Sequence, residues 1–132
     1  MEKLSIAKFQ HEVDDVLIRH RSVLDLLTKL QESSARVNRA VAKSATDCGC
    51  IELHVKKQEL PAGISYSQLK NHMSSHVEGN VCNVCKEKIE QEISTNFFYI
   101  AALCNLLDIN LEELLNNYHN NQLKTLGKYS LL

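Results

Sequence analysis

The chain has 132 residues, enough for one domain with its own core, and its formal net charge of −1 gives no overall field that would attract nucleic acid or an anionic membrane. No signal-peptide pattern follows Met1, and no apolar run approaches the roughly 18 residues that a membrane span needs. One proline, four glycines and few aromatic residues are typical of a mostly helical protein. We therefore expect a single all-α domain over residues 1–132, cytoplasmic, with no membrane partner; the scattered basic residues also argue against a nucleic-acid partner.

Two helices are predicted in the first third of the chain. Apolar residues recur at helical spacing from Leu4 to Arg19. Ser22 can cap a second, longer helix that runs from Val23 to Ser44. The apolar stripe of the second helix consists of Val23, Leu26, Leu27, Leu30, Ser34, Val37 and Val41.

Residues 46–82 have a different character. Ile51, Leu53 and Val55 alternate with polar residues, which predicts a short strand. Ser65 can cap a short helix that extends to Val77. We interpret the whole segment as an insertion between two helical halves.

Two more helices are predicted in the last third. A long one runs from Asn83 to Leu107, and Asn110 with Glu113 is a capping pair for the next. The side chains expected to face inward are Ile89, Ile93, Phe97, Ile100 and Cys104 in the long helix, and Leu111, Leu114, Leu115 and Tyr118 in the last one.

Four of the five cysteines form two close pairs, Cys48-Gly-Cys50 and Cys82-Asn-Val-Cys85. Zinc prefers four soft ligands in a tetrahedron, and two short-spaced pairs joined by a loop provide them. We therefore predict that these residues hold a structural zinc ion, with no open position for catalysis. A redox pair and metal-free thiols remain alternatives, and Cys104 fits a buried, small apolar residue.

The segments FFYIAALCNLL and DINLEELL, within Glu90–Leu115, resemble the MazG-like nucleoside triphosphate pyrophosphohydrolases. In that family one helix begins with an acidic ExxD motif and an earlier helix carries EExxE. The resemblance covers roughly the first 45 and the last 50 residues. It implies a bundle of four to five helices, with residues 46–82 inserted, that assembles as a homodimer or homotetramer.

Carried over by position, the EExxE motif falls on Gln31, Glu32 and Ala35, and ExxD falls on Glu92 and Thr95. The family uses these acids to hold Mg²⁺, so the resemblance implies that Glu32 and Glu92 are candidate magnesium ligands in a site that has lost three of its five acids. Their spacing alone favours ordinary exposed helix acids, and only the resemblance supports the metal site.

Basic residues follow the place where the acidic charge is lost. Arg36 and Arg39 are candidate phosphate contacts that need no metal. They can equally pair with Glu32 and Glu92, or lie on a solvated helix face.

Three functions follow from these observations. The degenerate motifs favour a divergent MazG-like protein that binds a nucleotide or a protein in a regulatory role, with weak or no hydrolase activity. The first alternative is an active, Mg²⁺-dependent nucleoside triphosphate pyrophosphohydrolase in which Asp108 or Glu112 supplements the site. The second is a zinc-stabilised interaction module whose contact surface is the inserted segment.

Overall fold

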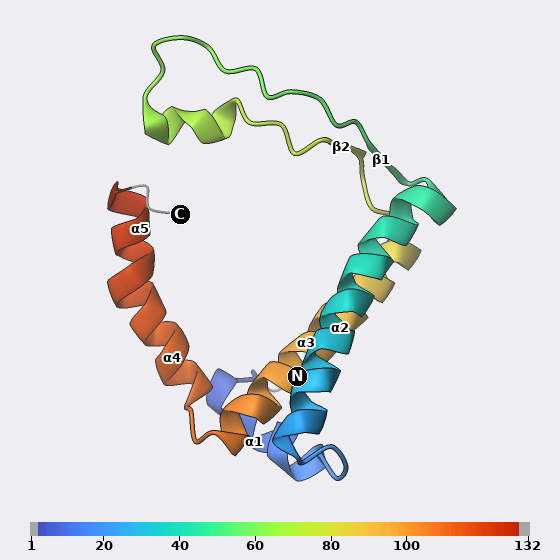
Figure 1. Cartoon of the computed structure of the whole chain (residues 1–132), viewed down its shortest axis with the longest axis vertical. Coiled ribbons are helices and arrows are strands. Elements are labelled where there is room, and N and C mark those ends of the chain that lie inside the picture. The colour runs from blue at the N-terminus through green and yellow to red at the C-terminus, as the bar shows by residue number, and fades with distance from the viewer. Residues whose placement is uncertain (1–2, 130–132) are drawn as a thin grey trace.

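The computed structural model describes residues 3–129, which are mostly helical (Figure 1). Within that range the elements in chain order are α1 (Ile6–Val16), α2 (Val23–Lys43), the π-helix η1 (Ser44–Cys48), β1 (Ile51–Leu53), the 3₁₀ helix η2 (Tyr66–Asn71), β2 (Val77–Gly79), α3 (Asn83–Leu106), α4 (Leu111–Asn117), the π-helix η3 (Tyr118–Leu123) and α5 (Lys124–Tyr129). Among the described residues, no helix combines the length and the apolarity that crossing a bilayer requires.

The two long helices, α2 and α3, lie side by side and run in opposite directions (Figure 1). Small side chains let them approach closely, because Ser33 on α2 and Ser44, the residue that follows α2, are fully buried. The side-chain amide of Asn96 on α3 donates to the hydroxyls of Ser33 and Ser34, at 2.9 Å each. These contacts set the register between the two helices.

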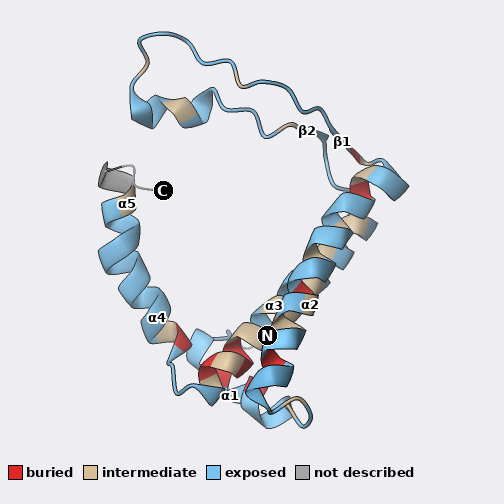
Figure 2. Ribbon diagram, viewed as in Figure 1, coloured by how far each residue is buried: buried red, intermediate tan, exposed pale blue. Residues whose placement is uncertain are grey.

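The apolar core lies at the end of this hairpin where α1 and the start of α4 pack against α3 (Figure 2). Gln10 on α1 is buried there, and it donates to the carbonyl of Ile109 at 2.7 Å and accepts from the amide of Leu111 at 2.8 Å. Asn105 in turn donates to the backbone carbonyl of Gln10. The turn between α3 and α4 is therefore held against α1 by buried hydrogen bonds. The members of the buried apolar cluster are Val13, Leu26, Ala101, Ala102, Cys104 and Leu111.

At the other end of the hairpin the inserted segment projects away from the helices (Figure 1). Its base is a two-stranded antiparallel sheet in which Ile51 lies opposite Gly79 and Leu53 lies opposite Val77. Ile51 is buried, while most of the segment beyond it is exposed. The insertion predicted between the helical halves is thus a ribbon whose two ends lie together at the ends of α2 and α3.

Several predicted features differ in detail. The strand ends at Leu53 and excludes Val55, because β2 pairs with only three residues. The helix capped by Ser65 is a six-residue 3₁₀ helix that stops well before Val77. In the C-terminal arm, formed by α4, η3 and α5, Leu111 is buried as expected, but Leu114, Leu115 and Tyr118 are each more than 40% exposed, because the arm extends away from the core after its first turn (Figure 2).

Candidate metal centre and the groove beside it

Local structure brings the four cysteines of the two pairs together. Cys48 ends the π-helical turn that follows α2, and Cys50 precedes β1. Cys82 is the N-cap of α3 and Cys85 lies in its first turn. Since β1 pairs with β2 and α2 packs against α3, the pairs meet, and the four Sγ atoms lie within 4.8 Å of one another.

The sulfur spacing fits a tetrahedral zinc site. Zn–S bonds of about 2.3 Å place the sulfurs of a tetrahedron about 3.8 Å apart. The Sγ atoms of Cys48 and Cys82 are 3.8 Å apart, far beyond the roughly 2.05 Å of a disulfide. The geometry is therefore that of four free thiols around a space suited to one ion, and the four sulfurs would fill its coordination shell.

The pKa values of two of the clustered thiols are shifted in opposite directions. The amide of Cys85 donates to the sulfur of Cys82 at 3.5 Å, and this lowers the pKa of Cys82 to about 7. Burial, with the neighbouring thiols, raises the pKa of Cys85 to about 12. Four thiolates this close repel one another, and a divalent cation removes that repulsion.

Two glycines with positive φ support the cluster. Gly49 has a φ of +79°, which lets the chain turn tightly between its two cysteine neighbours. Gly79 has a φ of +88°, and a Cβ there would lie 2.7 Å from the carbonyl oxygen of Cys50. Glycine at position 79 therefore lets β2 approach β1 beside the sulfurs.

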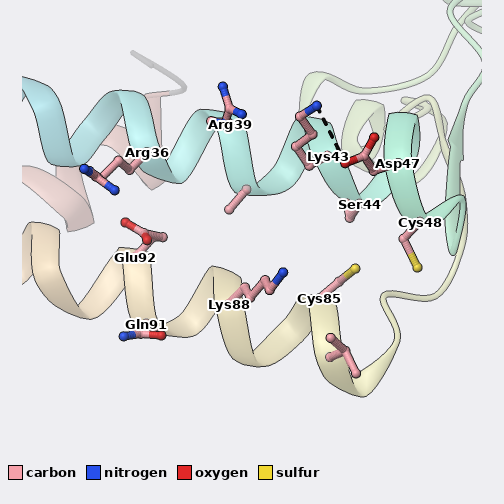
Figure 3. A pocket seen from close by; sticks show the side chains of 12 residues that line it. Arg36, Arg39, Lys43, Ser44, Asp47, Cys48, Cys85, Lys88, Gln91 and Glu92 are labelled. Atoms are coloured by element: carbon pink, nitrogen blue, oxygen red, sulfur yellow. Dashed lines mark ion pairs between the residues drawn. The ribbon is translucent and has the colours of Figure 1, made fainter.

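A groove of about 780 Å³ lies next to the cysteines, between α2 and α3 (Figure 3). Its polar walls carry Arg36, Arg39 and Lys43 from α2, and Lys88, Gln91 and Glu92 from α3. Lys43 pairs with Asp47 at 3.7 Å. Figure 3 shows Lys88 and Glu92 projecting from α3 into the space between the helices, whereas Arg39 points away from α3.

Glu32 and Glu92 line one smaller cavity, of about 250 Å³, which adjoins this groove through Arg36. Thr95 lines it too, so three of the motif positions carried over from the family meet there. Asp108 and Glu112, the acids expected to supplement the site in an active hydrolase, line neither cavity.

The carboxylate of Glu32 is already paired. It accepts from the guanidinium of Arg36 at 3.1 Å and lies 3.4 Å from the ammonium of Lys29. The hydrogen bond from Arg36, followed by that from Lys29, holds the pKa of Glu32 below its usual value. Of the readings left open for Arg36, the structure shows the pairing with Glu32, whose carboxylate lies between two cations.

Two parts of the site were not predicted. Lys88 and Gln91 line the groove, and the available signal was that Lys88 lies one helical turn from both Cys85 and Glu92. On the ribbon, His54 lies 2.9 Å from Glu52 and 3.4 Å from Glu78, and the hydrogen bond with Glu52 raises the pKa of its imidazole. Because Glu52 and Glu78 lie directly opposite each other, protonated His54 relieves a like-charge pair.

The described residues thus form a mostly helical protein in which a four-cysteine cluster closes a helical hairpin beside a polar groove. Comparison with protein-family models, with curated proteins and with solved structures finds no match to this chain.

Proposed function

We propose that this chain is a divergent MazG-like protein that binds the phosphates of a nucleotide in the groove between α2 and α3 and has weak or no hydrolase activity. A structural zinc ion on Cys48, Cys50, Cys82 and Cys85 holds the end of the groove. One observation carries the proposal: the carboxylate of Glu32 is occupied by Arg36 and Lys29, where a hydrolase needs free acids for Mg²⁺.

Magnesium binding in this cavity is weak for a physical reason. Mg²⁺ takes hard oxygen ligands in an octahedron and is held in enzymes by carboxylates together with substrate phosphates. Glu32 and Glu92 are the two acids that line the cavity, and Glu32 must give up two ion pairs to bind the metal. Even where Mg²⁺ binds, it lacks the further carboxylates that would position water for attack.

The charge of the groove favours phosphate itself. Five basic and three acidic side chains line the groove and its adjoining cavity. A bound phosphate can accept a charge-assisted hydrogen bond from Arg36 in place of Glu32, and a second one from Lys88. The groove can therefore bind phosphate without a metal ion. The volume of about 780 Å³ is within the range of small-molecule sites.

The zinc centre competes for part of this charge. A zinc ion with four thiolates has a net negative charge, and Lys43 and Lys88 line the groove beside Cys48 and Cys85. If Lys88 serves only the thiolates, Lys88→Gln weakens zinc binding and leaves nucleotide binding unchanged. If Lys88 instead contacts phosphate, Lys88→Gln weakens nucleotide binding and leaves zinc binding unchanged.

The test uses the zinc-loaded chain with a panel of nucleoside triphosphates. We expect nucleotide to raise the melting temperature without Mg²⁺, since a ligand at 100 times its dissociation constant adds about 2.7 kcal/mol. Arg36→Gln should remove most of this shift, and Lys56→Gln on the exposed ribbon is the matched control. Release of pyrophosphate with Mg²⁺ or Mn²⁺ that is lost in Glu92→Gln would instead establish the hydrolase.

A protein-binding role for the ribbon is the second candidate. Large apolar side chains are exposed along it, among them Val55, Leu60, Tyr66 and Met73. A chain that shows no nucleotide-induced shift but loses a cellular partner when residues 55–75 are replaced by a short glycine-serine loop would favour this role.

A further inference from the structure

A second group of metal-ligating side chains lies at the base of the ribbon, outside the cysteine cluster and the groove. The carboxylates of Glu52 and Glu78 and the imidazole of His54 each place one ligand atom within 4.8 Å of the other two. All three side chains are more than half exposed, so an ion can reach them from solvent.

The pairing of the two strands places these three side chains on one face of the ribbon. Glu52 on β1 lies directly opposite Glu78 on β2. His54 follows Glu52 by two residues, and side chains two apart along an extended chain point to the same face. Although β1 ends at Leu53, the amide of His54 donates to the carbonyl of His76 at 2.9 Å. Backbone hydrogen bonds between the strands therefore hold the three ligands in place.

The distances among the ligand atoms match those around a single metal ion. Metal–nitrogen and metal–oxygen bonds of about 2.1 Å place neighbouring ligand atoms about 3.0 Å apart in an octahedron and about 3.4 Å apart in a tetrahedron. Nε2 of His54 lies 2.9 Å from Oε2 of Glu52 and 3.4 Å from Oε2 of Glu78. An ion can therefore bind the imidazole and both carboxylates with little movement of the side chains.

The charge of the group also suits a divalent cation. Glu52 and Glu78 lie directly opposite each other, and like charges at opposed positions of paired strands destabilise the pairing. A proton on the imidazole of His54 neutralises one of the two negative charges. A divalent ion held by both carboxylates and a neutral imidazole neutralises both charges, so it removes the repulsion more completely.

We propose that Glu52, His54 and Glu78 bind a divalent first-row transition-metal ion at a site separate from the cysteine cluster. One imidazole and two carboxylates are harder ligands than four thiolates, so the two sites prefer different metals. Zinc binds first to the thiolates, whereas Mn²⁺ and Fe²⁺ suit the oxygen-rich ligands of the ribbon. Three protein ligands leave at least one coordination position open to water or to another ligand, which the four cysteines do not.

The bound ion joins the two strands of the ribbon. Glu52 and His54 come from the first strand and its extension, and Glu78 comes from the second, so the metal cross-links the strands on the ribbon side of the cysteine cluster. Ile51 and Gly79, the paired residues nearest that cluster, already fix the two strands relative to each other. Ligands that are held in position before the ion arrives lose less conformational freedom when they bind it.

The experiment measures Mn²⁺ binding to the full-length chain that carries one equivalent of zinc, from the loss of the electron paramagnetic resonance signal of free Mn²⁺. Mn²⁺ prefers oxygen and nitrogen ligands, so it leaves zinc on the thiolates. We expect one Mn²⁺ per chain, and His54→Gln and Glu78→Gln should each raise its dissociation constant at least about tenfold. His72→Gln and Glu59→Gln are the matched controls, since both residues are exposed on the same ribbon, and they should bind Mn²⁺ as the native chain does.

A variant of the groove separates the two metal sites that Mn²⁺ could occupy. Glu92 lines the cavity in which an active hydrolase would hold its metal, so Mn²⁺ binding that is lost in Glu92→Gln and kept in His54→Gln places the ion in the groove and overturns the inference. A native chain that binds no Mn²⁺ also overturns it, since His54 is then only an ion-pair partner of the two carboxylates.

The inference goes beyond nucleotide binding and is tested independently of it. The ribbon variants change exposed side chains, so their helical content and zinc content should stay at native levels. The thermal shift with nucleotide is measured without Mn²⁺, and Mn²⁺ binding is measured without nucleotide. A chain that fails one test can therefore pass the other, and each failure overturns only its own proposal.

Discussion

Replacing one of the proposed zinc ligands, by Cys85→Ser, tests the metal centre most directly. A serine hydroxyl is a poor replacement for a thiolate, and the remaining three sulfurs no longer close the coordination shell. The change replaces one sulfur atom with oxygen in the first turn of α3, so the helix itself should persist. The expected loss of stability is therefore that of the cross-link.

The size of this loss follows from the loop that the metal closes. The chain between Cys50 and Cys82 is a loop of about 30 residues, and a cross-link across such a loop removes about 12 cal/mol/K of unfolded-state entropy, or about 3.6 kcal/mol at 25 °C. The inserted segment adds little apolar burial of its own to offset the loss, since most of it is exposed. For a domain of this size, we expect the melting temperature to fall by roughly 10–15 °C.

The assay combines thermal unfolding, followed by circular dichroism, with zinc content measured by mass spectrometry. The native chain should hold one zinc per chain, and a strong chelator should lower its melting temperature to that of Cys85→Ser. The variant itself should not respond to the chelator. Cys104→Ala is the matched control, because Cys104 is a buried thiol outside the cluster and its variant should keep both the zinc and the chelator response.

Two outcomes would refute this reasoning. If the native chain purified from zinc-containing medium held no metal, there would be no metal cross-link for Cys85→Ser to break. A Cys85→Ser variant that keeps one zinc per chain and its full melting temperature would show that the sulfurs do not act together.

Three further predictions test other contacts. Gly79→Ala should lower the affinity for zinc at least about tenfold, measured by competition with a chelating dye, because the new methyl meets the carbonyl of Cys50 at a strained, positive φ; unchanged affinity would argue against the close approach. Gln10→Ala should lower the free energy of unfolding in urea by about 2–3 kcal/mol, since it leaves the buried amide of Leu111 and the partly buried carbonyl of Ile109 unpaired. A loss below about 1 kcal/mol would contradict this. Arg36→Gln should raise the pKa of Glu32 in an NMR titration, because the native ion pairs lower that pKa. The ion pairs stabilise the fold at pH values above the pKa of Glu32 in the unfolded chain, and this stabilisation is lost as the pH falls through its pKa in the folded chain. An unmoved pKa would show that Arg36 does not pair with Glu32 in solution.

The sequence predicted the helices well because their signals are local. Helical periodicity and the caps at Ser22 and Asn110 placed α2, α3 and the start of α4 within a residue or so of their observed bounds, and both cap side chains accept from helix amides. Pairing of Arg36 with Glu32 was one of the readings that the sequence left open, and their i, i+4 spacing allows it. Each of these depends on residues within one turn of each other.

The sequence could not show what covers each apolar surface. Periodicity marked Phe97 and Leu114 as inward-facing, yet both are exposed in the single chain. An apolar stripe indicates that a helix has a surface to bury, but it does not indicate which element, or which chain, packs against that surface. In the same way, cysteine spacing indicated zinc, but the meeting of the two pairs depends on strand pairing between Ile51 and Gly79.

The way the ribbon joins the helices has an evolutionary consequence. Its entry and exit strands leave the cysteine cluster side by side, and beyond Leu53 and Val77 it contributes no member to the buried apolar cluster at the far end of the hairpin. Insertions, deletions or wholesale replacement of the outer loop can therefore accumulate without shifting α2 against α3. Because the paired strands and the cysteine cluster fix both ends of the ribbon, the outer loop between Leu53 and Val77 is an exchangeable module, free to diversify while the helices stay under constraint.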